Sequence, residues 1–241
     1  SIVDELNCCK MLVLARLVLA AIMCRFSKIW KLRTVNLAIA LLLTAGSILA
    51  EQLPVKTYTI ADGLARDFIN KIKQDPRGFL WFCTAEGISR FDGYDFVNYG
   101  VTDGLPHRVV NDLLIKQDGT YLFGTEGGLV QFDPESIDSN GKRFSQIRLG
   151  NNAVEPSVES MIEDRDGSVW LGTSHGVFRL TGSRKNWTAE AIIQDPVTGS
   201  RVSDAGSVFL DRSGSLWIGT GTNGVFRYRS GQPLEHYTEE N

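Results

Sequence analysis

The feature that most constrains the fold of this chain is a segment that occurs four times in its second part. The copies are Asn70–Phe91, Asn111–Phe132, Glu159–Leu180 and Gly206–Tyr228. The glycine that the copies share recurs after 41, 48 and 47 residues, as Gly78, Gly119, Gly167 and Gly214. A period of ~40–50 residues is typical of propellers and other repeat arrays, so the repeat predicts a fold built from similar units.

Each copy places the same residue types in the same order. A tryptophan stands three residues after the shared glycine in three copies, as Trp81, Trp170 and Trp217, and Leu122 replaces it in the second. A small residue and then a threonine follow, as Cys83-Thr84, Gly124-Thr125, Gly172-Thr173 and Gly219-Thr220. A second glycine comes next, as Gly87, Gly128, Gly176 and Gly224, and then an apolar pair followed by Arg90, Gln131, Arg179 or Arg227.

The first copy shows how one unit folds. Asn70–Gln74 has strand length, and Asp75–Gly78 is a turn whose proline and glycine suit the required dihedral angles. Phe79–Thr84, Ile88–Phe91 and Asp95–Tyr99 supply three further strands, and Leu234–Thr238 resembles the outer strand of the last unit. Four short antiparallel strands make one propeller blade, so the fold class is an all-β propeller of about four blades.

The array is expected to be an incomplete ring. Rings close with ~4–8 blades, and an open array exposes an apolar blade face at each end unless a cap covers it. The segment Gln232–Asn241 does not resemble a dedicated cap.

The tryptophans are interpreted as packing between neighbouring blades, where large aromatic side chains are usually buried. The small residue two positions later, on the same side of the strand, is expected to leave room for the indole. The alternative is that the tryptophans stack on a ligand.

Residues 1–50 differ from the repeats. From Met23, a basic stretch that ends at Arg33 is followed by the apolar run Leu37–Leu43 and by small residues up to Ala50. This is the pattern of a secretory signal peptide over residues 23–50, with residues 1–22 as translated upstream sequence or an extension of the leader. A membrane anchor or a buried helix is the alternative, but Leu37–Ala50 is shorter than the ~20 residues that span a bilayer. The repeats then occupy residues 51–241.

Charge and chemistry exclude several functions. Residues 51–241 carry 19 basic and 26 acidic residues, so a nucleic-acid backbone is an unfavourable partner. Cys83 is the one cysteine in this part, and the three histidines, His107, His175 and His236, have no metal-ligand spacing. We therefore expect neither a metal nor a cofactor, and we assign no catalytic residue.

The copies resemble the two-component regulator propeller repeat, whose pattern is roughly D-x-x-G-x-(L/V)-W-(I/L)-G-T-x-x-G-(L/V)-x-R-(F/Y). Asp164–Thr173 and Asp211–Thr220 follow this pattern closely. The segment Tyr58–Leu64, which precedes the first copy, also resembles the family. The departures are Leu122 for tryptophan, Cys83 for glycine and the long connection Asp133–Ser157.

This resemblance implies the sensor region of a receptor on the periplasmic or extracellular side of a bacterial inner membrane. It implies further blades, a β-sandwich, a membrane helix and a histidine kinase or diguanylate cyclase beyond this chain. A small ligand, carbohydrate-derived by the same resemblance, would be the partner, and a receptor dimer is compatible with it. The alternatives are a secreted platform for protein interactions and a propeller lyase or glycosidase.

Two corresponding inter-blade loops are the predicted ligand-binding sites, because the loops of successive blades gather at one mouth of a propeller. The candidate residues are Asp62, Arg66 and Asp67 in the first loop and Asp103, His107 and Arg108 in the second. The alternative is that each Asp-Gly pair only forms a turn.

Overall fold

The computed structural model describes residues 55–134, 141–150, 154–183, 186–191 and 202–239. The chain divides into two units, Ser1–Lys56 and Thr57–Asn241, and the following account concerns the second. The predicted leader at residues 23–50 lies outside the described residues. Within the described ranges, no helix has both the length and the hydropathy that a membrane crossing requires.

Four antiparallel sheets of four strands follow one another along the described chain, which confirms the predicted fold class. The first sheet contains β1 (Ile69–Gln74), β2 (Leu80–Thr84), β3 (Gly87–Phe91) and β4 (Phe96–Tyr99). The second contains β5 (Val110–Ile115), β6 (Tyr121–Thr125), β7 (Gly128–Phe132) and β8 (Phe144–Ile147). The third contains β9 (Val158–Glu163), β10 (Val169–Thr173), β11 (Gly176–Ser183) and β12 (Asn186–Ala191). The fourth contains β13 (Ala205–Leu210), β14 (Leu216–Thr220), β15 (Val225–Tyr228) and β16 (Glu235–Tyr237).

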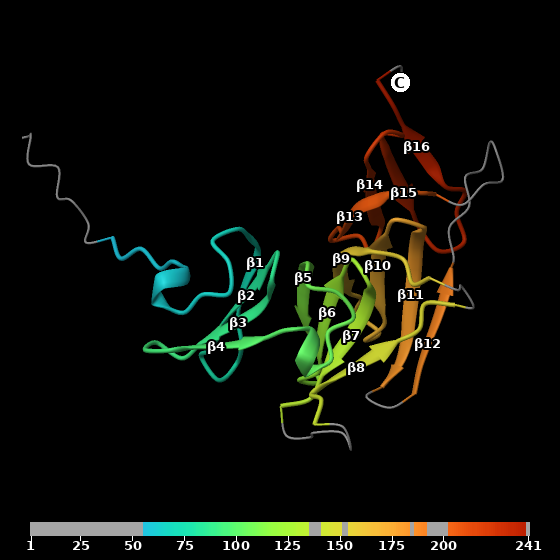
Figure 1. Ribbon diagram of the computed structural model, residues 1–241. Helices are drawn as coiled ribbons and strands as arrows, with labels where there is room; N and C mark the ends of the chain where they lie inside the picture. The colour runs from blue at the N-terminus through green and yellow to red at the C-terminus, as the bar shows by residue number, and fades with distance from the viewer. Residues whose placement is uncertain (1–54, 135–140, 151–153, 184–185, 192–201, 240–241) are drawn as a thin grey trace, which may run out of the picture. The chain divides into compact units, whose positions relative to one another are not determined.

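The sheets pack face to face in chain order, and the first strands of neighbouring sheets, β1, β5, β9 and β13, contact one another. Figure 1 shows the four sheets as successive blades, and they do not close into a ring. Apolar clusters fill the junctions. Trp81, Phe123 and Phe132 lie in the first, Leu122 and Leu171 in the second, and the third contains Trp170 with residues of β13 to β15.

In three of the four repeats, the turn aspartate and the tryptophan are hydrogen-bonded to each other. The indole Nε1 donates to the carboxylate Oδ2 over 3.0 Å in Trp81–Asp75, and over 2.9 Å in both Trp170–Asp164 and Trp217–Asp211. The repeat arginine completes the arrangement, because Arg90, Arg179 and Arg227 each lie over the indole of their own sheet.

The threonine that all four copies share closes the next turn. Thr84 Oγ1 donates to the Gly87 carbonyl over 2.9 Å and accepts the Glu86 N–H over 3.0 Å. Thr125, Thr173 and Thr220 donate to the corresponding glycine carbonyls. Gly87 itself has φ +112°, and a Cβ there would lie 2.3 Å from the Tyr99 carbonyl oxygen, so only glycine fits.

Trp81 and Trp170 are 0% and 4% exposed and belong to the apolar clusters at the sheet junctions, whereas Trp217 on the last sheet is only partly buried. The expected purpose of the small residue two positions later was wrong. The atoms nearest to a Cβ at Gly124 belong to Val158, and the nearest at Gly172 is the Ala205 carbonyl oxygen. At Gly124 and Gly172 the small residue therefore makes room for the first strand of the next sheet, not for an indole.

The second copy lacks both partners of the aspartate–tryptophan pair, because Lys116 and Leu122 stand in their places. An indole from the next sheet occupies the junction instead. Trp187 on β12 donates to Gln131 Oε1 over 2.8 Å, and its ring lies 5.3 Å from the ammonium nitrogen of Lys116.

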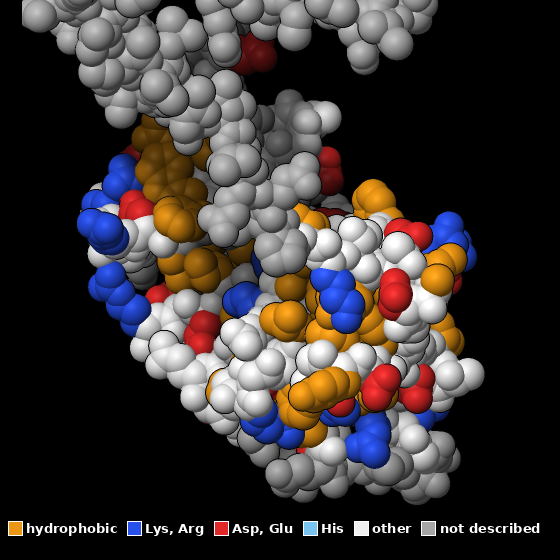
Figure 2. All heavy atoms as spheres, turned by 90° about the vertical axis from the view of Figure 1, so that its left-hand side faces the viewer, with side chains coloured by type: hydrophobic (Ala, Val, Ile, Leu, Met, Phe, Trp, Pro, Cys, Tyr) orange, Lys and Arg blue, Asp and Glu red, His pale blue; other side chains and the backbone are white. Residues whose placement is uncertain are grey.

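Among the described residues, the two end sheets each have a face that no other sheet covers. Ile72 on the first sheet is 55% exposed, Phe68 just before β1 is 67% exposed, and Phe209 on the last sheet is 61% exposed. Figure 2 looks onto the end formed by the first sheet and shows hydrophobic side chains at its surface among charged ones. Tyr58 packs edge-on against Phe91 and Phe96 and covers part of the first sheet.

Candidate functional site

One end of the sheets carries the connections that lead into β1, β5, β9 and β13. We call this end the upper rim. It also carries the turns between the second and third strands of each sheet, because Glu126 N donates to the Val109 carbonyl and Ser157 N to Ser174 Oγ. The opposite end, with the Asp-x-x-Gly turns, is the lower rim. All six predicted ligand-binding residues lie in the upper-rim connections.

Two of the predicted residues, Asp62 and Asp103, stabilise short 3-10 helices. Asp62 ends η1 (Ile60–Asp62), and its Oδ2 accepts the Thr59 N–H over 2.8 Å. Asp103 ends η2 (Val101–Asp103), and its Oδ2 accepts the Gly100 N–H over 2.8 Å. The glycines after them have φ +101° and +109°, so turn formation accounts for both Asp-Gly pairs.

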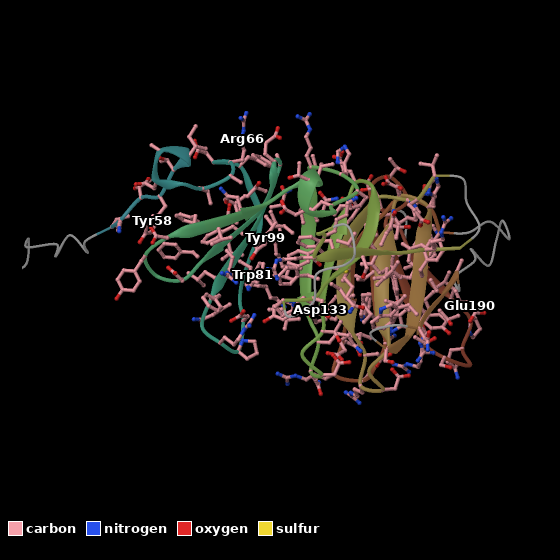
Figure 3. All side chains as sticks on the ribbon, turned by 60° about the horizontal axis from the view of Figure 1, so that its bottom comes forward. Tyr58, Arg66, Trp81, Tyr99, Asp133 and Glu190 are labelled. Carbon is pink, nitrogen blue, oxygen red and sulfur yellow. The ribbon has the colours of Figure 1, made fainter. Side chains whose placement is uncertain are left out.

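Arg66 and Asp67 lie at the exposed tip of the first loop. Asp67 Oδ1 accepts the Ile60 N–H over 2.9 Å, which fixes the carboxylate against η1. Arg66 has neither a hydrogen bond nor an ion pair within the described part of the chain. Figure 3 shows it pointing outward from the rim. Its guanidinium is therefore free to receive an acceptor from outside the protein.

Of the other two predicted residues, Arg108 pairs with a glutamate of a neighbouring turn, and His107 accepts a backbone N–H beside another glutamate. Arg108 Nη1 lies 2.9 Å from Glu86 Oε1, with the two side chains 64% and 41% exposed. His107 Nδ1 accepts the Val109 N–H over 3.2 Å and lies 3.4 Å from Glu126 Oε2. Because exposed ion pairs contribute only ~0–1 kcal/mol, the Arg108 guanidinium can exchange Glu86 for another acceptor at little cost.

A β-bulge occurs at the upper-rim end of the first strand in all four sheets, at Asn70, Asn111, Glu159 and Gly206. The two asparagines reach across to the next sheet. Asn70 Nδ2 donates to the Val110 carbonyl over 2.9 Å, and Asn111 Nδ2 donates to the Val158 carbonyl over 3.1 Å. Their Oδ1 atoms accept no hydrogen bond from the described residues.

These bulges place acceptors near the strand ends that meet at the rim. Bulges are frequent beside functional sites because they re-aim side chains. The rim thus combines guanidinium donors from the loops with amide oxygen acceptors from the strands.

Sequence reasoning missed Glu86, Glu126 and the bulge asparagines. The glutamates occupy variable positions between the shared threonine and the second glycine, and such positions in a fixed turn face solvent. A comparison of the positions at which the four copies differ would have identified these two glutamates. Bulges leave no comparable mark in the sequence.

Within the described ranges, no cluster of three His, Cys, Asp or Glu side chains could hold a metal ion. His236 stacks on Phe226 with ring centroids 4.1 Å apart. Burial raises the pKa of the Cys83 thiol, so this cysteine stays protonated.

The fold places the chain among β-propeller proteins. Residues 154–175 match the family model of the two component regulator propeller, so the chain carries the repeat that its sequence resembles. A comparison with curated proteins gave no match.

Solved structures share the fold. The extracellular domain of one putative hybrid two component system from B. thetaiotaomicron is 24% identical, with a TM-score of 0.56 over 79% of this chain and 24% of that one. That of a second system from the same organism is 23% identical, with a TM-score of 0.52 over 73% and 22%. PorZ, a surface component of the type-IX secretion system of Porphyromonas gingivalis, is 17% identical, with a TM-score of 0.57 over 72% and 27%. The chain thus spans about a quarter of the length of these structures.

Proposed function

We propose that residues 57–241 are part of an extracytoplasmic sensor that binds a small, carbohydrate-derived ligand at the upper rim and signals through domains outside this chain. The likeness in fold to extracellular domains of hybrid two component systems supports the sensor role. The observation that carries the binding site is Arg66, an exposed cation without a partner in the described residues, on the same rim as Arg108.

The chemistry of this rim suits a ligand rich in hydroxyl groups. Guanidinium groups donate to hydroxyl or carboxylate oxygens, and the Oδ1 atoms of Asn70 and Asn111 accept from hydroxyl protons. Asp67 adds a carboxylate that its bond to Ile60 N holds in place. Binding sites fix ligand orientation with a small number of such convergent polar groups.

The same asparagines offer a route from binding to signalling. Each bonds the first strand of the next sheet, so a ligand held by its Oδ1 acts on the contact between two blades. A ligand changes the balance between two states only when its affinity for them differs. We propose that the two states differ in the relative position of neighbouring blades at the upper rim.

A glycan array probed with the full chain tests the proposal, followed by calorimetry on each bound glycan. Arg66→Gln with Arg108→Gln is expected to weaken binding at least tenfold. The matched control is Arg212→Gln, an exposed arginine at the lower rim. Equal binding by the double variant would overturn the site, and conversion of the bound glycan to product would favour a lyase or glycosidase instead.

A further inference from the structure

A cavity of ≈ 270 Å³ opens at the lower rim, on the opposite side of the sheets from the proposed sensor site. Its wall combines Arg77 from the β1–β2 turn with Tyr121 and Phe132 from the second sheet. Figure 3 labels Trp81, which is buried at the junction of these sheets, and Asp133, which follows β7 and also lines the cavity. The volume is slightly below the ~300–1,000 Å³ of pockets for drug-sized molecules, so it suits a smaller ligand.

The cavity exists because this junction lacks a contact that the other two junctions make. Arg165, the residue after the turn aspartate of the third sheet, donates to the Arg212 carbonyl of the fourth. At the same position in the second sheet, Gln117 N donates to Glu163 Oε2 of the third over 2.9 Å. Pro76 occupies this position in the first sheet, and it has neither an N–H nor a polar side chain to bridge the gap.

A cation faces this space. Arg77 Nη2 lies 3.7 Å from Asp75 Oδ2, beyond hydrogen-bonding distance, and the Arg77 side chain is 46% exposed. The Asp75 carboxylate is already satisfied by four donors, the backbone N–H groups of Arg77 and Phe79 and the side chains of Trp81 and Tyr121. Asp75 takes its hydrogen bonds from these groups. The Arg77 guanidinium also interacts with the Tyr121 hydroxyl and lies over the Phe79 ring, but its five N–H groups leave donors for another acceptor.

The rest of the wall is partly polar and partly apolar, since Thr120, Gln131 and Asp133 line it together with four apolar residues. Ile115, Phe132, Pro76 and Pro134 line it, and Phe132 is 2% exposed. A ligand that matches both parts has one anionic group for the guanidinium and a short apolar body for the aromatic and aliphatic wall.

We propose that this inter-blade cavity binds a small organic carboxylate, with its carboxylate on Arg77 and its hydrocarbon part against Phe132. The bidentate geometry of guanidinium and carboxylate makes arginine well suited to this group. The site is separate from the upper rim, so it stands or fails independently of the proposed sensor function.

Butyrate is a suitable probe, because butyramide has nearly the same size and shape without the charge. The readout is the Nε1–H resonance of Trp81 in the full chain, since this indole shares Asp75 Oδ2 with Tyr121 at the edge of the cavity. We expect butyrate to shift the resonance saturably in the millimolar range, and butyramide to bind at least fivefold more weakly.

Two variants test whether Arg77 is the residue that binds the carboxylate of butyrate. Arg77→Gln is expected to remove the preference for butyrate over butyramide while the Trp81 resonance stays in place, which shows that the sheet junction is intact. Arg212→Gln, in the corresponding turn of the last sheet, is expected to leave the preference unchanged. Absence of a saturable shift, equal binding of the two probes, or an unchanged preference in Arg77→Gln would overturn the proposal.

Discussion

The indole Nε1–H of Trp81 donates to Oδ2 of Asp75 over 3.0 Å, and the same oxygen accepts the hydroxyl of Tyr121 from the next sheet over 2.9 Å. One carboxylate therefore ties the tryptophan of its own blade to the neighbouring blade. The Asp-x-x-Gly-x-x-Trp spacing of the repeat brings the two side chains into contact, because the turn folds the second strand back beside the aspartate.

Trp81→Phe is expected to lower the free energy of unfolding by about 2–4 kcal/mol, from the loss of a buried hydrogen bond to a charged group and of part of the buried indole. Trp170→Phe is expected to have a similar effect. Trp217→Phe, on the uncovered face of the last sheet, is expected to cost clearly less because its indole is only half-buried. Urea denaturation of the three variants measures this order, and equal losses would contradict the role of blade packing.

At the junction of the second and third sheets, we expect two substitutions to have coupled effects on the free energy of unfolding. Leu122→Trp alone is expected to destabilise by about 1–3 kcal/mol, because Trp187 already packs at this junction and a second indole overfills it. Combining it with Trp187→Ala should recover part of the loss. A double-mutant cycle measures the coupling, and additive effects would show that the two positions do not compete for the same space.

The hydrogen bonds to the Asp75 carboxylate lead us to expect that the free energy of unfolding depends on pH in the acidic range. Burial opposes ionisation, but the hydrogen bonds from Trp81, Tyr121 and two backbone N–H groups outweigh it and lower the pKa of Asp75. A lowered pKa in the folded state stabilises the protein above the unfolded value of ~3.9, and this contribution disappears as the pH falls through the folded pKa.

The free energy of unfolding of Asp75→Asn is therefore expected to fall less steeply than that of the unmodified protein between about pH 5 and about pH 2. Denaturant unfolding across this range measures the slopes. Asp95→Asn, at an exposed turn, is the matched control and should keep the original slope. If the free energy of unfolding of Asp75→Asn changed with pH as steeply as that of the unmodified protein, Asp75 would not be the source of the acid dependence.

Gly87→Ala is expected to destabilise by about 1–3 kcal/mol, since its positive φ and the close Tyr99 carbonyl both oppose a Cβ. Gly206→Ala is the control, because a Cβ there meets no atom within 4 Å and its φ is not positive. Thermal unfolding compares the two, and equal changes would show that the turn tolerates a side chain.

The repeat allowed the blades to be predicted because each copy encodes its own local structure. The turn glycines, the shared threonine and the aspartate–tryptophan pair act within one sheet, so their spacing is visible in the sequence. The strands predicted at Asp95–Tyr99 and Leu234–Thr238 correspond to β4 and β16, with small differences at their ends.

Contacts between sheets could not be read in this way. Trp187 lies 65 residues after Leu122, and no repeat position marks it as the indole of that junction. The purpose of Gly124 and Gly172 was misjudged for the same reason, since the closest atoms that they make room for belong to the next sheet. At the rim, the loops were predicted because they correspond to each other in the sequence. Glu86, the partner of Arg108, belongs to the preceding sheet, so its position depends on how successive sheets are placed.

The most direct test of the central claim is calorimetric titration of the full chain with the glycans that it retains on an array, alongside the variant that combines Arg66→Gln and Arg108→Gln. We predict saturable binding without chemical change of the ligand, weakened at least tenfold in the double variant and unchanged in Arg212→Gln. Binding that is insensitive to the double substitution, or the absence of any bound glycan, would contradict a carbohydrate-sensing site at the upper rim.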